Sequence, residues 1–242
     1  MKKTFIHFKD LILHEDDAIV LVNKPGEMAS LDDKSNRNLN HLAKQYHPDL
    51  SLCHRLDKNT SGILLLAKGA DHYRTIAMQF EKRQIRKTYL TLAAGVHHFT
   101  DHTIDLPLYV STKKKVSVNK GEGKKATTIV DTIDNFRNFT LLQCQPISGR
   151  MHQIRVHLAA VGCPIVGDEL YGGRDILLSE IKRKYKVSGR KMEERPINHG
   201  YLLHAQKLSF QHPASGEQMT VEAEIPKNFA VSLKVLEKYD RN

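Results

Sequence analysis

The chain has 242 residues, of which 40% are hydrophobic and 26% charged, as is usual for a globular protein with a substantial core. No apolar run is long enough to cross a bilayer, and Lys9 and Asp10 interrupt the N-terminal apolar stretch, which excludes a signal peptide. Lys and Arg number 37 against 27 Asp and Glu, and this net charge of +10 favours a polyanionic partner, foremost nucleic acid. Three widely spaced cysteines, Cys53, Cys144 and Cys163, form no disulfide or metal-binding pattern and favour a reducing cytoplasm.

Strands and helices are predicted in alternation along the chain, without repeats, a low-complexity linker or a break in composition. This mixture predicts a single α+β domain over 1–242. In chain order, the first predicted elements are a buried strand within 18–30 that runs into a Pro-Gly turn, a helix within 38–47 stopped by Pro48, and a strand over 62–68. A helix over 71–84, a strand over 87–95 and two strands within 126–146 around the turn 134–138 follow. The last predicted elements are a helix over 150–162, a hairpin within 205–226 and a helix over 228–239.

Positive charge is concentrated in three tracts, Lys82–Lys87, Lys113–Lys125 and Lys182–Lys191. The second contains Gly121 and Gly123, so we expect a mobile hairpin or loop there. These tracts fit either solvated loops or contacts to nucleic acid phosphates, and three of them in one small domain favour the second interpretation. The residues predicted to contact an RNA backbone are Lys82, Arg83, Lys113, Lys114, Lys115, Lys124 and Lys125.

The sequence motifs give little support for a metal site or a nucleotide-binding site. Histidine and carboxylate side chains cluster at 14–16 and 97–102, but adjacent histidines on a strand point to opposite faces. There is no H-E-x-x-H and no paired cysteine, so the sequence predicts no metal site. Phosphate-loop, dinucleotide and serine-nucleophile signatures are missing as well.

The stretch "HRLDKNTSGILLLAK" (54–68) places the carboxylate of Asp57 between Arg55 and Lys58. A carboxylate flanked by cations is ionised at neutral pH, and it can act as a nucleophile, a base or an electrostatic partner of a positive transition state. A surface ion pair, or a cap of the turn that follows, would explain the same pattern. These residues by themselves leave the alternatives open.

A second polar cluster, "SGRMHQIRVH", lies at the start of the predicted helix over 150–162. His152 and Arg155 are three residues apart and share a helical face, so Arg155 is expected to point across a cleft from a rigid element. Helix starts usually prefer acidic residues, and cations there indicate that something negative lies close by. The arginine fork suits a carboxylate or a phosphate.

These two clusters, in this order, resemble the RluA family of pseudouridine synthases. The family signature H-R-L-D-x-x-T-S-G-x-L-L-x-A-K fits 54–68 at every fixed position, and G-R-x-H-Q-I-R-x-H followed by G-x-P-I-x-G-D-x-x-Y-G fits 149–173. Shorter blocks, "VNKPGEMAS", "RKTYLTLAAG" and "LLHAQKLSFQHPASGE", are similar to further family motifs, and the resemblance covers about 10–228. One departure is that Pro25 and Gly26 are adjacent, where the family usually has K-P-x-G.

The resemblance implies a mostly antiparallel mixed sheet with flanking helices and a central RNA-binding cleft. It implies isomerisation of uridine to pseudouridine in structured ribosomal or transfer RNA, without a cofactor or metal and without an obligate protein partner. Asp57 matches the catalytic aspartate, Tyr89 the tyrosine that packs on the target base, and Arg155 the basic residue that pairs with the aspartate. The expected substrate-binding residues are His54, Arg55, Arg150, His152 and Gln153.

Two alternatives to this activity remain at the level of sequence. One is an RNA-binding protein of the same fold that has lost catalysis, which the intact Asp57, Tyr89 and Arg155 disfavour. The other is a metal-dependent nuclease that uses the histidines. Many relatives carry a small RNA-binding domain ahead of the catalytic one, and none is expected here because the first motif begins near residue 20. RNA affinity would then come from the catalytic domain.

Overall fold

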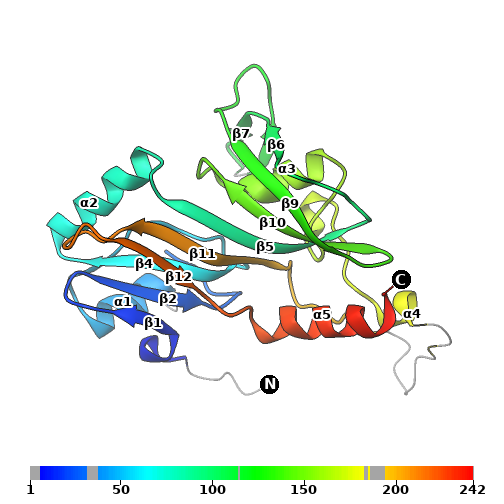
Figure 1. Ribbon diagram of the computed structural model, residues 1–242, viewed down its shortest axis with the longest axis horizontal. Helices are drawn as coiled ribbons and strands as arrows, with labels where there is room; N and C mark the ends of the chain where they lie inside the picture. The colour runs from blue at the N-terminus through cyan, green and yellow to red at the C-terminus, as the bar shows by residue number, and fades with distance from the viewer. Residues whose placement is uncertain (1–5, 32–37, 114, 183–184, 186–193, 242) are drawn as a thin grey trace. The chain divides into compact units, whose positions relative to one another are not determined.

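A computed structural model describes residues 6–31, 38–113, 115–182, 185 and 194–241 (Figure 1). The chain divides into two compact units, and each is built from two stretches of sequence. Unit 1 comprises Met1–Lys87 and Ala205–Glu224, and unit 2 comprises Thr88–His204 and Ile225–Asn242. The single catalytic domain and its central cleft therefore stay predictions. Within the described ranges, no helix is both long and apolar enough to cross a membrane.

Unit 1 is a sheet with two helices. The strands β1 (Ile12–Glu15), β2 (Ile19–Lys24), β4 (Ser61–Lys68) and β11 (Leu203–Gln211) are neighbours in that order, while β3 (Leu50–Leu52) pairs with β4 and β12 (Gln218–Glu222) with β11. A 3-10 turn (Phe8–Leu11) precedes β1, and the helices are α1 (Leu39–Tyr46) and α2 (Ala70–Glu81). Buried Ile19, Leu65, Ile76 and Phe210 form part of one core cluster.

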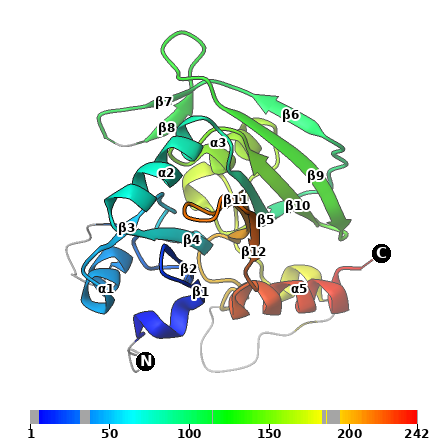
Figure 2. The same cartoon turned by 60° about the vertical axis from the view of Figure 1, so that its left-hand side comes forward.

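In unit 2 the strands β5 (Arg86–Ala94), β10 (Phe139–Pro146), β9 (Thr127–Asn135) and β6 (His102–Asp105) are neighbours in that order, and each pairs antiparallel with the next. A separate two-stranded hairpin consists of β7 (Leu108–Val110) and β8 (Val116–Val118). The helices are α3 (Gln153–Ala160), α4 (Leu178–Ile181) and α5 (Lys227–Tyr239), with a 3-10 turn at Glu169–Tyr171. Figure 2 shows β9 and β10 side by side with α3 next to them.

The predicted strands and helices are confirmed, and so is the α+β class, but two details of the helices were wrong. The helix predicted over 150–162 begins only at Gln153, because His152 takes a left-handed backbone (φ 54°) and ends a turn in which the Gln153 N–H donates to the Arg150 carbonyl. The helical spacing of Tyr73, Ile76, Ala77 and Phe80 predicts one packing face for α2, but Tyr73 is 40% exposed. Gln79 is buried instead, because its amide exchanges two hydrogen bonds with the backbone of Gln211 on β11.

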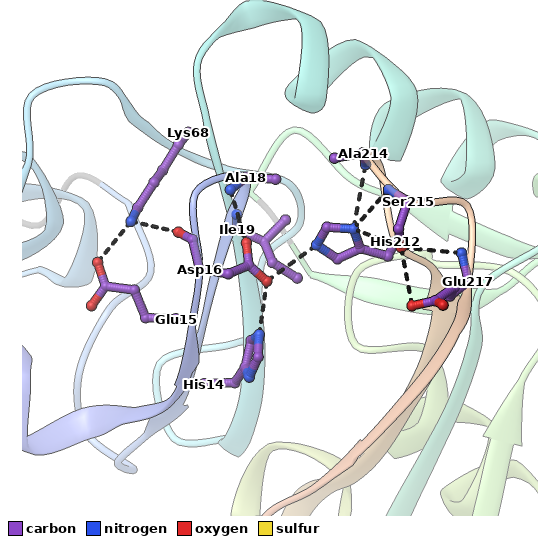
Figure 3. A network of polar contacts seen from close by, with 10 residues as sticks. All are labelled: His14, Glu15, Asp16, Ala18, Ile19, Lys68, His212, Ala214, Ser215 and Glu217. Carbon is purple, nitrogen blue, oxygen red and sulfur yellow. Dashed lines mark hydrogen bonds and ion pairs between the residues drawn. The ribbon is translucent and has the colours of Figure 1, made fainter.

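The turns at one end of unit 1 are joined by the polar network in Figure 3. Asp16 accepts hydrogen bonds from the backbone N–H groups of Ala18 and Ile19, and the rings of His14 and His212 lie 2.8 and 3.1 Å from the same carboxylate oxygen. These contacts lower the pKa of Asp16 to about 2 in spite of its partial burial. The cluster at 14–16 thus ties the β1–β2 turn to the β11–β12 turn.

Gly62, at the start of β4, is required by close packing. Its φ is 115°, and a Cβ at this position would lie 2.3 Å from the carbonyl oxygen of Ala205 on β11. No L side chain can occupy that space unless the backbone of β11 shifts.

We therefore predict that Gly62→Ala lowers the free energy of unfolding by about 3 kcal/mol, from overpacking and backbone strain together. Gly216→Ala is the matched control, because Gly216 also has a positive φ (75°) but nothing lies within 4 Å of the added methyl group. It should cost about 1 kcal/mol. Urea denaturation of both variants measures the difference, and equal costs would contradict the packing argument.

Candidate active site

Asp57 lies in unit 1, in the loop between β3 and β4. Its side chain is half-buried, whereas those of Arg55 and Lys58 on either side are exposed. The Thr60 N–H donates to the Asp57 carbonyl oxygen (3.1 Å) and closes the turn that leads into β4. The carboxylate is therefore presented at the edge of a tight, partly buried turn.

Ser30 fixes the backbone just before Asp57. Its buried hydroxyl donates to the Leu56 carbonyl oxygen (2.7 Å) and accepts from the Leu56 N–H (3.0 Å). A residue 26 positions earlier in the chain thereby satisfies both polar backbone groups of Leu56. Because buried backbone groups must be paired, this contact selects one path for the loop. No pattern in the sequence singled out Ser30.

Lys24, at the end of β2, is a second residue that the sequence analysis missed. Its side chain is 0% exposed, and its Nζ donates to the carbonyl oxygens of Pro25 (2.9 Å), Met28 (2.8 Å) and Lys58 (3.2 Å). Burial lowers the pKa of Lys24 to about 7, while the negative charge of Asp57 acts in the opposite direction. Lys24 therefore connects the β2 turn to the loop and places a titrating amine where it interacts with Asp57. The available signal was a lysine at the end of a buried apolar strand.

His54 holds the other end of the loop. Its Nε2 accepts a hydrogen bond from the Leu65 N–H on β4 (3.1 Å), and its ring lies 5.0 Å from that of Phe80. Burial, followed by the charge of Lys87, lowers the pKa of His54 to about 3, so the ring is neutral near pH 7. These contacts anchor the loop to β4, and the predicted role of His54 and Arg55 in substrate binding stays a prediction.

Arg155 lies in unit 2, on the first turn of α3. Its Nε and Nη2 donate to the two carboxylate oxygens of Asp168, each at 2.7 Å, and the side chains of Arg155 and Asp168 are 7% and 2% exposed. A bidentate pair of this kind fixes the plane of the guanidinium group. Asp168 lies within the matched motif over 149–173, but the sequence did not indicate its role.

Aromatic rings complete the surroundings of Arg155. The guanidinium carbon lies 4.3 Å from the ring centre of Tyr201 and 4.9 Å from that of Tyr171. The Tyr171 hydroxyl lies 2.7 Å from Nδ1 of His152, the residue with the left-handed backbone. Cation–π contacts favour the charged side chain and restrict its movement. His152 and Arg155 therefore belong to one network, but His152 precedes the helix and is linked to Arg155 through Tyr171 and not along a shared helical face.

The other residues of unit 2 that were predicted to bind or act on substrate differ in their burial. Gln153 is buried, and its amide bonds to Thr127, Thr128, Ser148 and the Arg150 N–H, so all its polar capacity is used within the protein. Arg150 is exposed, and Tyr89 is half-buried on β5 beside the core that contains Cys144 and Leu158. The contacts of Gln153 indicate a structural task, although its role with substrate is untested.

The basic tract after β7 is a hairpin, as predicted. Lys113 and Lys115 are exposed in the turn between β7 and β8, Lys124 and Lys125 are exposed after β8, and Lys114 lies outside the described residues. In unit 1, Lys82 and Arg83 are exposed after α2. Most of the Lys182–Lys191 tract also lies outside the described residues. Among the described side chains, no three His, Cys, Asp or Glu are grouped so as to hold a metal ion.

The comparisons with known proteins decide the family. The sequence model of a family described as RNA pseudouridylate synthase matches residues 18–160, which include Asp57, Tyr89 and Arg155. The chain belongs to this family. The synthase is therefore an isomerase of uridine in RNA, in agreement with the sequence prediction, and a catalytically inactive protein is not favoured.

Its relatives cover most of the chain. The synthase is 32% identical to ribosomal large subunit pseudouridine synthase D of Haemophilus influenzae, over 93% of this chain and 70% of the relative. It is 33% identical to ribosomal large subunit pseudouridine synthase C of Escherichia coli, over 94% and 70%. Among solved structures, human RNA pseudouridylate synthase domain containing 4 is similar, with a TM-score of 0.70, 26% identity and 95% of each chain covered.

The depressed pKa of Lys24 predicts a pH-dependent stability. The folded-state pKa is about 7 and the unfolded value about 10.4, so between these pH values the unfolded synthase binds one more proton than the folded one. The stability of wild type relative to Lys24→Met should therefore rise with pH, by about 1.4 kcal/mol per pH unit between pH 7 and 10. Denaturation at several pH values measures this. Lys44→Met, at an exposed lysine with one carbonyl contact, should give a flat difference, and a flat difference for Lys24 too would refute the prediction.

The Arg155–Asp168 pair should matter far more to stability than an exposed pair of the same geometry. We expect Asp168→Asn to lower the free energy of unfolding by about 3–5 kcal/mol, because it removes the negative charge that forms a bidentate pair with a buried arginine. Asp134→Asn, which breaks the bidentate pair with the 40% exposed Arg241, should cost at most about 1 kcal/mol. Similar losses in the two variants, measured in urea, would count against the inference from burial.

Proposed function

We propose that the synthase converts specific uridines of large-subunit ribosomal RNA to pseudouridine, with Asp57 as the catalytic carboxylate and without a cofactor. The RNA is inferred from the printed names of the relatives, several of which refer to the ribosomal large subunit. Transfer RNA, the second substrate class that the sequence suggested, is a weaker candidate because none of these names refers to it. The single observation that carries the proposal is Asp57 within the matched family signature, with the backbone just before it fixed by Ser30.

In the proposed reaction the N1–C1′ bond of uridine breaks, the base turns, and C5 bonds to C1′ while the C5 proton is lost and N1 gains one. Cleavage builds positive charge on the sugar, which a nearby carboxylate stabilises. Asp57 either attacks the sugar or removes a proton from it, and both routes need it ionised. The target base must leave its stack to reach the carboxylate.

The loop contacts support this role for Asp57. The clamp of Ser30 on Leu56 and the bonds from Lys24 restrict the backbone on both sides of the carboxylate. A group held in place before the substrate arrives needs little rearrangement in the transition state. The buried Lys24 amine adds a favourable charge interaction with Asp57.

Arg155 and Tyr89 are proposed to act in the same reaction, as their positions in the family motifs imply. Asp168, Tyr171 and Tyr201 support the arginine, since they hold the guanidinium group in one orientation. Tyr89 is proposed to pack on the target base and to help remove the C5 proton. A ring on a strand backed by a buried core is a firm surface for such packing.

Asp57→Asn tests the proposal directly. The exchange keeps the size of the side chain and removes its charge, so the turnover should fall at least ~10³-fold while RNA affinity changes little. Tritium release from RNA labelled at C5 of uridine measures turnover, and filter binding measures affinity.

Asp49→Asn is the matched control, because it removes an exposed carboxylate of the same unit that the proposal does not involve. It should retain the turnover of wild type. Residual activity of Asp57→Asn within tenfold of wild type would rule out a catalytic carboxylate. Loss of tritium release on adding a chelator would instead revive a metal-dependent reaction.

A further inference from the structure

The outer face of α5 in unit 2 carries a row of lysines. Lys227, Lys234 and Lys238 are all exposed and lie at intervals of seven and four residues, which places them along one face of the helix. Val231, 39% exposed, lies between them on the same face. The buried residues of α5, Phe229, Ser232 and Leu236, lie on the opposite face. The row spans about 16 Å at 1.5 Å per residue.

The acidic residues of α5 are occupied elsewhere. Glu237 pairs with Arg241 (2.7 Å), and the buried carboxylate of Asp240 accepts from the backbone and side-chain amides of Asn138 (2.9 and 2.7 Å). Within the described part of the chain, no carboxylate lies at ion-pair distance from Lys227, Lys234 or Lys238. A solvated helix face usually interleaves both signs of charge, and this face does not.

A second element adds a cation to the row. Lys182 follows α4, which lies beside the C-terminal end of α5 (Figure 1), and its Nζ lies 5.1 Å from the ring centre of Tyr239. The Nζ of Lys238 lies 5.2 Å from the same ring centre. Hydrogen bonding from Lys238, together with the charge of Lys182, lowers the pKa of the Tyr239 phenol. Two ammonium groups thus lie close to one ring, and among the described residues no carboxylate is within ion-pair distance of either, so a bound anion would stabilise the arrangement.

We propose that Lys182, Lys227, Lys234 and Lys238, here called the α5 lysine face, bind the phosphate backbone of the substrate RNA. The row matches a linear polyanion better than a single phosphate, since its charges are spread along about three turns of helix. The aromatic ring of Tyr239 among the ammonium groups suits nucleic acid as well. This inference builds on the proposed function, because it assumes an RNA longer than the target site.

The experiment compares RNA binding by wild type and by a variant that combines Lys182→Gln, Lys234→Gln and Lys238→Gln. The probes are an unmodified transcript of Escherichia coli large-subunit ribosomal RNA and poly(U), each bound at several salt concentrations. For every lysine that pairs with a phosphate in wild type, its replacement should reduce the slope of log K against log salt by roughly 0.7–0.9. At 0.1 M salt this change corresponds to a loss of affinity of about fivefold for each such lysine. Because such ion pairs do not read sequence, both probes should weaken alike.

The matched control combines Lys9→Gln, Lys44→Gln and Lys207→Gln, which lie in unit 1 and change the net charge by the same amount. In wild type these lysines contact the Tyr46 ring, the Pro48 carbonyl and Glu222. The control should keep the wild-type slope. Equal slopes for all three proteins would overturn the proposal and leave the face solvated or reserved for another partner. Equal flattening in both variants would overturn it too, since net charge alone would then explain the effect.

Tritium release separates this inference from the proposed function. If wild type releases tritium from the ribosomal transcript and the α5 variant binds with an unchanged slope, the α5 lysine face is refuted and the activity stands. If wild type releases none from this transcript while the slope still falls in the variant, the face binds RNA and the proposed substrate is wrong.

Discussion

The buried amine of Lys24 is the contact on which the loop around Asp57 depends. Three carbonyl oxygens, two from the turn after β2 and one from Lys58, converge on its Nζ. A neutral side chain of similar shape would leave these carbonyls without a donor in a region closed to water, at a cost of about 1–3 kcal/mol for each unpaired group. The burial that makes Lys24 a good donor also lowers its pKa to about 7, so the same residue is a structural link and a titrating neighbour of Asp57.

In each unit, buried polar contacts hold a group that has a proposed catalytic role. In unit 1 buried polar contacts from Ser30 and Lys24 fix a backbone path, and in unit 2 Asp168 and two tyrosines fix the plane of a guanidinium group. In each case the supporting residue lies far from the supported one along the chain or on a different element. Fully paired polar networks of this kind are rigid, and their partial removal is costly. Side chains with proposed catalytic roles are therefore supported by residues that need not touch RNA.

The described cations fall into two groups, those with partners inside the fold and those that are exposed. The cations with partners inside the fold are buried or stacked, as for Lys24 and Arg155. Exposed lysines collect on the β7–β8 hairpin and on α5, where few carboxylates remain to pair with them. The net charge of +10 favours a polyanionic partner, and these two surfaces carry exposed cations that suit a phosphate backbone.

The sequence by itself determined the longer strands and helices, the α+β class and the family, because periodic burial and long motifs are local properties of the chain, whereas strands and helices of three or four residues such as β3, β6 and α4 were not predicted. It also predicted a catalytic role for Asp57, and it indicated that Arg155 binds a negatively charged group. It did not find Asp168 as the partner of Arg155, the clamp of Ser30 on Leu56, the burial of Lys24 or the internal bonds of Gln153. These contacts join residues that are distant in sequence or face an interior whose shape is set by packing, so only the tertiary structure could decide which polar groups meet there.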